Sequence, residues 1–341
     1  MKNQLIGKYV EDYFSNYLCY ERGVSENTMR SYAYTIKELV KHIKSRKKIR
    51  ADKVTTEMVD RKSVTDYLRW LIETKKLSVT TCNQRLAIIS SFARYMAIED
   101  VTHSNQWHQI SEIKKKKAKS VPPNYLSEEG MQKLLEAIPT ATIKGRRDLA
   151  LLLLMYESGA RVQEVIDLTP QNIRISAPGS VRLHGKGNKT RIVPLSETPC
   201  EIIGVYMHEH KLDIPENNCK PLFYNNRGNH LSESGINYII NEYADIVRAD
   251  NPGLLPNRIS PHSLRHTRAM HLINNGLNLI YLRDILGHVS TQTTEIYARV
   301  NSKTRNEALE NAYIGVASEV PKTVVQDDEK LIAFLDKFSR K

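Results

Sequence analysis

Six polar residues in the second half of the chain have the types and order that suit metal-free phosphoryl transfer to a tyrosine: Arg161, Lys186, His262, Arg265, His288 and Tyr297. The tightest group lies in the stretch 261–267, where His262 and Arg265 are three residues apart on an expected helix and so project from one face. His288 follows a glycine at an expected helix end, and Tyr297 comes nine residues later. The spacing predicts one shared site.

Each residue type has a defined use in that chemistry. Attack on a phosphodiester builds charge on the non-bridging oxygens, and the guanidiniums of Arg161 and Arg265 can clamp them in fork geometry. A phenol is a weak nucleophile at its ordinary pKa of about 10, so Tyr297 needs cations and a base such as His262 beside it. Lys186, in a Gly-Lys-Gly turn, is a mobile donor that could protonate the leaving 5′ oxygen.

These residues resemble the catalytic set of the tyrosine recombinases (the phage-integrase family) of the two-domain, Xer- or Cre-like type, whose signature runs Arg, Lys, His-x-x-Arg, His or Trp, Tyr. The stretch 160–165 is similar to the first arginine box and 185–195 to the lysine hairpin, with no departure at the six positions. The resemblance implies that Tyr297 attacks a DNA phosphate, giving a 3′-phosphotyrosyl link and a free 5′-hydroxyl, with His288 assisting the arginines. Neither ATP, a metal nor another cofactor is expected.

Taken singly, each residue has an ordinary alternative. An arginine at a helix-to-helix turn is often a cap, and a Gly-Lys-Gly turn is often a plain hairpin. His262 and His266 are four residues apart and could be two metal ligands, but no glutamate adjoins His262 and no third ligand has a familiar spacing. His266 and His271 are therefore expected to be core histidines or neighbours of the site. The joint occurrence of six residues in order carries the prediction.

Composition bounds the class of protein. The chain has 341 residues, 40% of them hydrophobic, which is enough for two domains with a core in each. It has no run of 18 or more apolar residues and no charged-then-apolar leader, so neither a membrane span nor a secretory signal is predicted. Four scattered cysteines indicate reduced thiols. The expected location is the cytoplasm, with nucleoid association when the protein is on DNA.

The positive charge is concentrated in the first part of the chain. Residues 1–124 hold 24 Lys+Arg against 13 Asp+Glu, whereas residues 125–341 hold 26 against 25, for a net charge of +12 overall. Basic clusters at 44–50 and 114–119 suit contacts with phosphates, although a solvated basic surface is the alternative for either run. Double-stranded DNA is the predicted partner.

Residues 1–110 predict a helical bundle of four to five helices. Ser25 is the predicted cap of a helix over 26–43, and apolar stripes follow at helical spacing there and over 79–97. Glycine is nearly absent and no strand alternation occurs. The family resemblance implies that these two helices lie across DNA, with candidate contacts at Thr28, Arg30, Asn83 and Arg85.

Residues 111–124 combine a charge run with two prolines and predict an extended linker that contacts the phosphate backbone through Lys114, Lys115, Lys116, Lys117 and Lys119. The catalytic domain is expected over 125–315. It should be mostly helical, with one small antiparallel sheet from strands near 172–176, 180–184 and 190–194. Its hairpin supplies two further candidate DNA contacts, Lys189 and Arg191. The fold class is therefore mainly α.

Residues 316–341 predict a separate tail. Its helix would carry one apolar stripe made of Leu331, Phe334, Leu335 and Phe338. This helix could fold back on its own domain, but the resemblance implies docking on a neighbouring protomer and a homotetramer on DNA. The compact N-terminal domain favours a simple core site with two inverted half-sites. An accessory factor or a second recombinase is a further candidate partner.

Two other functions fit part of these observations. A type IB topoisomerase uses similar chemistry to relax DNA, but the linker, the tail and the close hairpin match favour strand exchange. An architectural DNA-binding protein would explain the charge and the helical bundle, yet not the six polar residues. The favoured function is site-specific DNA recombination, serving integration, excision, transposition or resolution of a DNA element.

Overall fold

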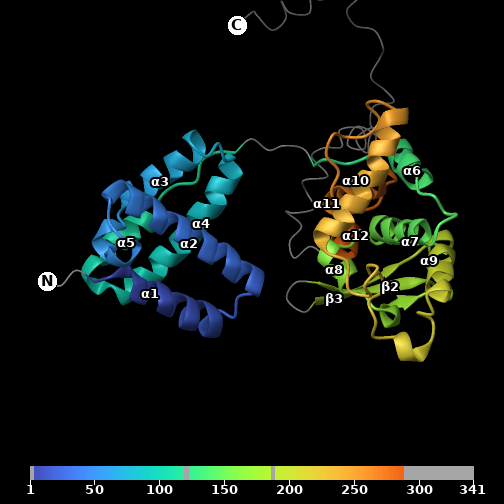
Figure 1. The fold of residues 1–341 in the computed structure, drawn as a ribbon, viewed down its shortest axis with the longest axis horizontal. Helices are drawn as coiled ribbons and strands as arrows, with labels where there is room; N and C mark the ends of the chain where they lie inside the picture. The colour runs from blue at the N-terminus through green and yellow to red at the C-terminus, as the bar shows by residue number, and fades with distance from the viewer. Residues whose placement is uncertain (1–3, 119–122, 186–188, 288–341) are drawn as a thin grey trace, which may run out of the picture. The chain divides into compact units, whose positions relative to one another are not determined.

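The computed structural model describes residues 4–118, 123–185 and 189–287. The chain forms two compact units, Met1–Ser120 and Val121–Lys341 (Figure 1). Lys119, Lys186, His288, Tyr297 and the whole predicted tail lie outside the described residues. Within the described part, no helix combines the length and the apolar character needed to cross a membrane.

The first unit is helical in its described part, as predicted. It comprises α1 (Ile6–Asp12), which continues as the π-helical stretch Tyr13–Glu21, then α2 (Glu26–Lys47), α3 (Arg61–Glu73), α4 (Val79–Glu99) and α5 (Ser104–Ser111). The predicted cap at Ser25 is present, because its hydroxyl accepts a hydrogen bond from the backbone N–H of Thr28. Helix α2 runs past the predicted end at residue 43 to Lys47. Basic side chains in its last turn interact favourably with the negative end of the helix dipole.

Aromatic side chains fill the core of this unit. The rings of Tyr13 and Phe92 lie edge to face with centroids 5.0 Å apart, and Phe92 meets the buried Trp107 in the same way at 6.0 Å. The indole Nε1 of Trp107 donates a hydrogen bond to the buried carboxylate of Asp100 at 3.1 Å, so this polar atom is satisfied inside the core.

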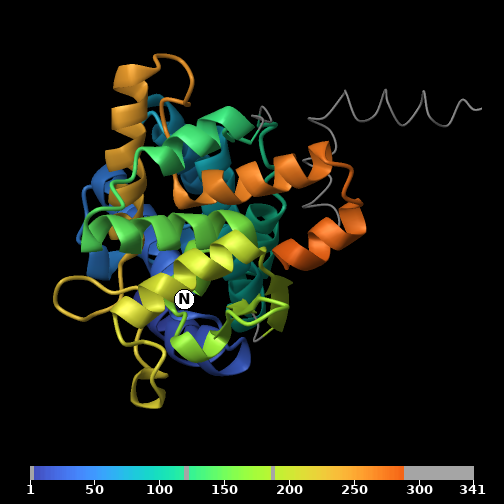
Figure 2. The ribbon, with the colours of Figure 1, turned by 90° about the vertical axis from the view of Figure 1, so that its right-hand side faces the viewer.

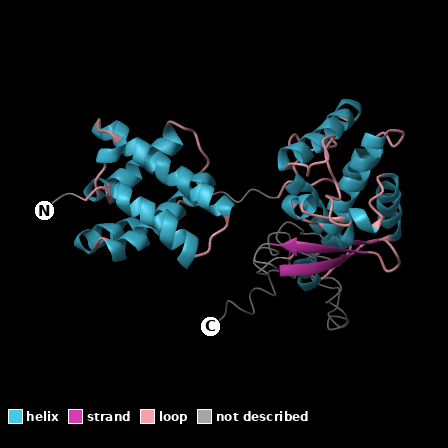
Figure 3. Cartoon of the chain, turned by 60° about the horizontal axis from the view of Figure 1, so that its bottom comes forward, coloured by secondary structure: helices cyan, strands magenta, loops and turns pink. Residues whose placement is uncertain are grey.

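The second unit is mostly helical with one small sheet (Figure 3). Its helices are α6 (Glu128–Glu136), α7 (Ile143–Ser158), α8 (Val162–Ile166), α9 (Glu197–Glu209), α10 (Glu233–Asp250), α11 (Pro261–Asn274) and α12 (Leu279–Leu286). The strands β1 (Ile173–Arg174), β2 (Ser180–Gly185) and β3 (Lys189–Pro194) form an antiparallel sheet in that order. The predicted fold class, mainly α with a small antiparallel sheet, is confirmed.

Strand β1 is shorter than the predicted strand at 172–176. The side chain of Asn172 accepts hydrogen bonds from the backbone and hydroxyl of Thr169 at 2.9 Å, which commits Asn172 to a 3-10 turn before the strand. Strands β2 and β3 lie where predicted, and Gly185 pairs with Lys189 at the base of their hairpin.

Helix α7 is the centre of the second unit. Residues 150–155 are all buried, and the helix packs against α9 and α11 (Figure 2). This stretch of six residues is apolar on every side, which is typical of a helical segment in a core. It ends at Gly159, whose φ of 55° is the left-handed conformation typical of a helix C-terminus. Arg161 lies two residues after this glycine.

Candidate active site

Arg161 lies between the end of α7 and the start of α8, and the structure holds it by three hydrogen bonds. Its backbone N–H donates to Oε2 of Glu164 at 2.9 Å, and its Nη1 donates to Oε1 of the same carboxylate at 2.8 Å. Its Nη2 donates to the carbonyl oxygen of Gly287 at 3.1 Å. The side chain remains 37% exposed, so a ligand in solvent can reach this guanidinium.

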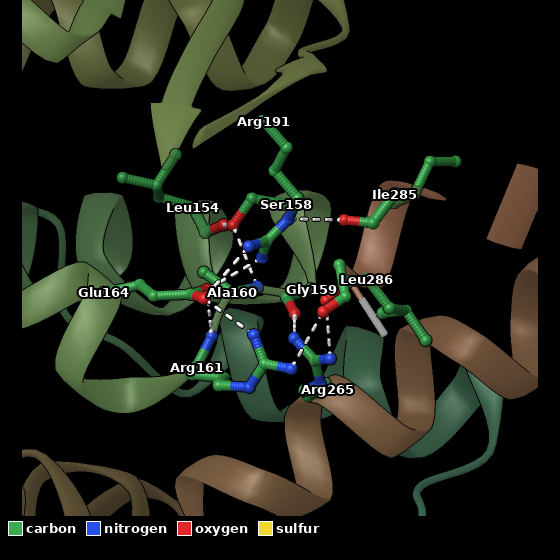
Figure 4. Close-up of polar contacts among 11 residues, drawn as sticks. Leu154, Ser158, Gly159, Ala160, Arg161, Glu164, Arg191, Arg265, Ile285 and Leu286 are labelled. Atoms are coloured by element: carbon green, nitrogen blue, oxygen red, sulfur yellow. Dashed lines mark hydrogen bonds and ion pairs between the residues drawn. The ribbon is translucent and has the colours of Figure 1, made fainter. Parts of the chain in front are cut away.

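Arg265 projects from α11 into the interior and is 1% exposed. Ser260 caps α11, because its hydroxyl accepts from the backbone N–H of Ser263, and Pro261 at the first helical position suits that start. The Nη1 of Arg265 donates to the carbonyl of Gly159 and its Nη2 to that of Leu286, both at 2.7 Å. Arg265 therefore ties α11 to the turn before Arg161 and to the end of α12 (Figure 4).

The two predicted arginines meet at one place, the C-terminal end of α12. Arg265 binds the carbonyl of Leu286 and Arg161 binds that of Gly287, the next residue. The carbonyls at a helix C-terminus carry partial negative charge, which favours cations there. The predicted convergence of Arg161 and Arg265 is thus present in the fold.

Glu164 is the buried anion of this cluster and was not predicted as a site residue. It is 5% exposed and accepts hydrogen bonds from Arg161 and from Arg191 at 2.7–2.9 Å. Burial alone would raise the pKa of this carboxyl, but the hydrogen bonds from Arg191 and Arg161 outweigh it and the pKa is lowered. Glu164 is close to Arg161 in the sequence, but only the fold brings Arg191 to it.

Arg191 lies on β3, and its side chain turns into the protein. Only 11% of it is exposed, and its three nitrogens donate to both oxygens of Glu164 and to the carbonyl of Ile285. As a candidate DNA contact, Arg191 was expected to have an exposed side chain. Strand alternation offers the missed signal, because Val193 is buried and Ile192 is 64% exposed, so Arg191 shares the inward face with Val193.

His262 is the second residue of α11 and has an exposed side chain. Desolvation and then the nearby cations Arg265 and Arg161 lower its pKa. The ring of His266, one turn further along, lies edge to face with it at a centroid distance of 4.2 Å. Desolvation and the neighbouring His262 lower the pKa of His266 to about 4. The lowered pKa values favour the neutral form of both rings, and a neutral imidazole can accept a proton.

His271 has the buried, hydrogen-bonded position predicted for a core histidine. Its Nε2 lies 3.0 Å from the carbonyl of Leu126, and its Nδ1 lies 2.9 Å from the hydroxyl of Tyr156. Since the carbonyl can only accept, Nε2 donates and Nδ1 accepts. Among the residues that the structure describes, no group of three or more His, Cys, Asp or Glu is placed to hold a metal ion.

The base of the lysine hairpin lies at the same cluster. A β-carbon added to Gly185, the residue before Lys186, would lie 3.1 Å from Oε1 of Glu164 and 3.7 Å from Nη1 of Arg161. The described residue that precedes His288 is Gly287, which binds Arg161. The described chain therefore approaches this cluster from both sides, although Lys186, His288 and Tyr297 themselves lie outside the described residues.

The candidate DNA contacts on α2 and α4 have different surroundings. Thr28 hydrogen bonds to the cap residue Ser25, and Arg30 forms an exposed ion pair with Glu26. Arg85 is half-buried and its guanidinium lies 4.6 Å from the ring centroid of Tyr34. Such stacking holds a guanidinium in place.

Asn83 binds the start of the linker. Its Nδ2 donates to the carbonyl of Lys116 at 2.8 Å, and its Oδ1 accepts from the N–H of Lys116 at 3.0 Å. The linker lysines themselves are exposed where described, as is Lys189 on β3. Asn83 therefore uses both ends of its amide on the linker backbone, while the lysine side chains face solvent.

Comparisons with known proteins agree with this architecture. Residues 124–304 match the Phage integrase family, and residues 11–100 match the phage integrase N-terminal SAM-like domain. The protein y4rC of Sinorhizobium fredii, named as an integrase/recombinase, is 30% identical over 338 residues, covering 98% of this chain and 99% of that protein. Tyrosine recombinase XerC of Staphylococcus haemolyticus is 31% identical over 300 residues, covering 88% and 95%.

Solved structures share the fold. The Tn1549 transposon integrase in complex with transposon right end DNA matches with a TM-score of 0.69 at 16% identity, covering 92% of this chain and 100% of that one. The XerH recombinase bound to its palindromic difH substrate matches with a TM-score of 0.63 at 21% identity, covering 85% and 81%. The family matches support recombination and not the topoisomerase or architectural alternatives. The chain therefore belongs to the phage integrase family and is a tyrosine recombinase that acts in site-specific DNA recombination.

Proposed function

We propose that this recombinase cleaves DNA with Tyr297 as nucleophile and rejoins it through a 3′-phosphotyrosyl intermediate. The observation that carries the proposal is the meeting of Arg161 and Arg265 on adjacent carbonyls at the end of α12, with His262 on the same helix as Arg265. Two cations and a neutral imidazole at one place are what attack by a phenol on a phosphodiester requires.

The two arginines take different parts. Arg161 is 37% exposed and offers donors to the non-bridging oxygens of the phosphate. Arg265 is 1% exposed and holds the carbonyls of Gly159 and Leu286, so its charge is fixed at the back of the site. A fixed charge needs no reorganisation when the transition state forms. His288 assists them as a further donor.

Proton movement completes the reaction. His262 accepts the proton of the Tyr297 hydroxyl as the bond from the phenolic oxygen to phosphorus forms. The bond from phosphorus to the 5′ oxygen breaks, and Lys186 supplies the proton that makes the free 5′-hydroxyl. The new phosphodiester retains the energy of the old one, so attack by the 5′-hydroxyl of a partner strand reverses these steps and releases Tyr297.

The first unit and the linker bind the duplex. The domains in this proposal are a core-DNA-binding domain over 1–110, a linker over 111–124, a catalytic domain over 125–315 and a tail over 316–341. The lysines at 114–117 are exposed, which supports a role for them in phosphate contacts that do not depend on base sequence. The protein acts in the cytoplasm, on DNA of the nucleoid.

The assembly on DNA is a homotetramer that exchanges the tail helix between protomers. The substrate is a core site with two inverted half-sites, and the palindromic substrate named for the solved XerH complex supports this expectation. A second recombinase or an accessory factor is a further candidate partner. Similar proteins include XerC recombinases, and the fold is shared with a transposon integrase. Experiment must therefore decide which kind of DNA element this enzyme recombines.

Covalent capture tests the proposal. Wild-type protein and Tyr297→Phe are mixed in EDTA with plasmid libraries that carry DNA flanking the gene, and protease-sensitive gel shifts are scored. A covalent adduct that forms only with the wild type supports Tyr297 as the nucleophile and recovers the site. An adduct of equal yield in Tyr297→Phe contradicts it.

A further inference from the structure

We propose that Arg191 is a positioning residue for strand cleavage, acting as a clamp that fixes the lysine hairpin, the arginine box and the turn before His288 relative to one another. This inference rests on the proposed function, because it assigns Arg191 a part in the same site. It replaces the surface role that the sequence predicted for this residue.

The clamp is made by one guanidinium that donates to two different elements. Its Nη1 and Nη2 donate to the two oxygens of Glu164 on α8 at 2.9 and 2.7 Å, and its Nε donates to the carbonyl of Ile285 on α12 at 2.7 Å. Since Arg191 itself lies on β3, three segments far apart in sequence meet at this side chain (Figure 4). A planar fork can satisfy such acceptors together, whereas an ammonium cannot reproduce the geometry.

The turn before His288 rests directly on this guanidinium. Gly287 has a φ of 63°, and a β-carbon there would lie 2.9 Å from Nη1, 3.1 Å from Cδ and 3.2 Å from Cζ of Arg191. The carbonyl of the same glycine accepts from Arg161. Gly287 is thus enclosed between two arginines, and moving Arg191 removes the surface on which the turn packs.

The hairpin is held from its other side. Arg191 lies opposite Leu183 on β2, two residues along β3 from Lys189, which pairs with Gly185 at the base of the hairpin. Glu164, which Arg191 binds, lies against the position of Gly185. The link from Arg191 to Glu164 therefore fixes the strand ends that flank Lys186 against the segment that carries Arg161.

The test separates positioning from phosphate binding and from loss of folding. Arg191→Lys keeps the positive charge but loses the fork, and Arg191→Gln loses both. Arg182→Gln is the matched control, because it removes one positive charge from an exposed position of the adjacent strand β2. Each protein is assayed for single-turnover cleavage of a nicked duplex that carries the captured site, and for equilibrium binding of the intact duplex at several salt concentrations.

Positioning predicts a fall of about 100-fold in the cleavage rate constant for Arg191→Lys and Arg191→Gln, as expected for a small displacement of reacting groups. Duplex affinity and its salt dependence stay as in the wild type, and Arg182→Gln cleaves at the wild-type rate. A merely destabilised protein would instead give a smaller amplitude with an unchanged rate constant, because fewer molecules would be active.

Two results overturn the inference. One is wild-type cleavage by Arg191→Lys. The other is a loss of duplex affinity with a salt slope lowered by about 1, the pattern of a lost phosphate contact. An assay of Tyr297→Phe on the same substrate distinguishes failure of the proposed function from failure of the role of Arg191. If that variant still forms an adduct, the proposed function fails; if it forms none while Arg191→Lys cleaves normally, only the role of Arg191 fails.

Discussion

The guanidinium of Arg265 donates a 2.7 Å hydrogen bond to the carbonyl oxygen of Gly159, and this contact joins α11 to the turn that carries Arg161. It bridges 106 residues of sequence. Both ends are buried or held in a left-handed turn, so the relationship is a property of the fold and not of a mobile surface. The two predicted arginines are therefore linked through the backbone, and their substitutions should differ in effect.

Arg265→Gln should destabilise the protein far more than Arg161→Gln. Removal of Arg265 leaves buried carbonyls at Gly159 and Leu286 without this donor, which costs about 1–3 kcal/mol for each group. Arg161 is 37% exposed and Glu164 keeps Arg191, so its loss should cost less than about 1 kcal/mol. Urea unfolding followed by circular dichroism measures the difference. Equal losses of stability would show that the buried bonds of Arg265 are not maintained in solution.

Gly287→Ala should impair cleavage, while Gly276→Ala should not. Both glycines have positive φ, so both substitutions carry similar backbone strain, about 1–2 kcal/mol. A β-carbon at 287 would lie 2.9 Å from Arg191, whereas one at 276 would have nothing within 4 Å. Single-turnover cleavage of the captured site should fall about 100-fold for Gly287→Ala alone. Equal cleavage by the two variants would show that the packing of the turn on Arg191 has no part in the reaction.

The pH dependence of cleavage should reflect a neutral His262. Desolvation and the charges of Arg265 and Arg161 lower its pKa below the ordinary value of about 6.5. A base with a lowered pKa stays unprotonated to lower pH. The acid limb of the cleavage rate constant should therefore have its midpoint below about pH 6.5, the ordinary pKa of an imidazole. The limb should be absent from the residual activity of His262→Gln. An acid limb above that value in the wild type, or an identical limb in the variant, would exclude His262 as the base.

Helices were the most predictable part of this fold, because their signals are local. Ser25 accepts the hydrogen bond expected of a helix cap. Strand β1 begins at Ile173 and not at the predicted residue 172, because the side chain of Asn172 accepts hydrogen bonds from Thr169 in a turn. This bond joins residues three apart, so it is a local signal, but one that strand propensity does not include.

The site was predictable in its cations but not in what holds them. Arg161 and Arg265 follow from residue type and order. Glu164 and the carbonyls of Ile285 to Gly287 became partners only when α8, β3 and α12 came together. The bonds from Asn83 to the backbone of Lys116 were hidden from the sequence for the same reason, since they join residues 33 apart. Contacts between distant segments carry no local signal.

Asn83→Ala should release the start of the linker. The side-chain amide holds both backbone polar groups of Lys116, and alanine removes both bonds. Trypsin should then cut after the lysines at 114–117 faster than in the wild type, because a protease needs a locally free backbone. Gln84→Ala, at the exposed neighbouring position, is the control and should be cut at the wild-type rate. Identical cutting of all three proteins would mean that the amide does not hold the linker in solution.

The most direct test of the account is to locate the DNA linkage in the protein. The captured adduct is digested with nuclease and trypsin, and the modified peptide is sequenced by mass spectrometry. We expect a phosphorylated tyrosine in the peptide 284–299, whose single tyrosine is Tyr297. A linkage on any other peptide, or on a serine or threonine of this one, would contradict the assignment of Tyr297 as the nucleophile.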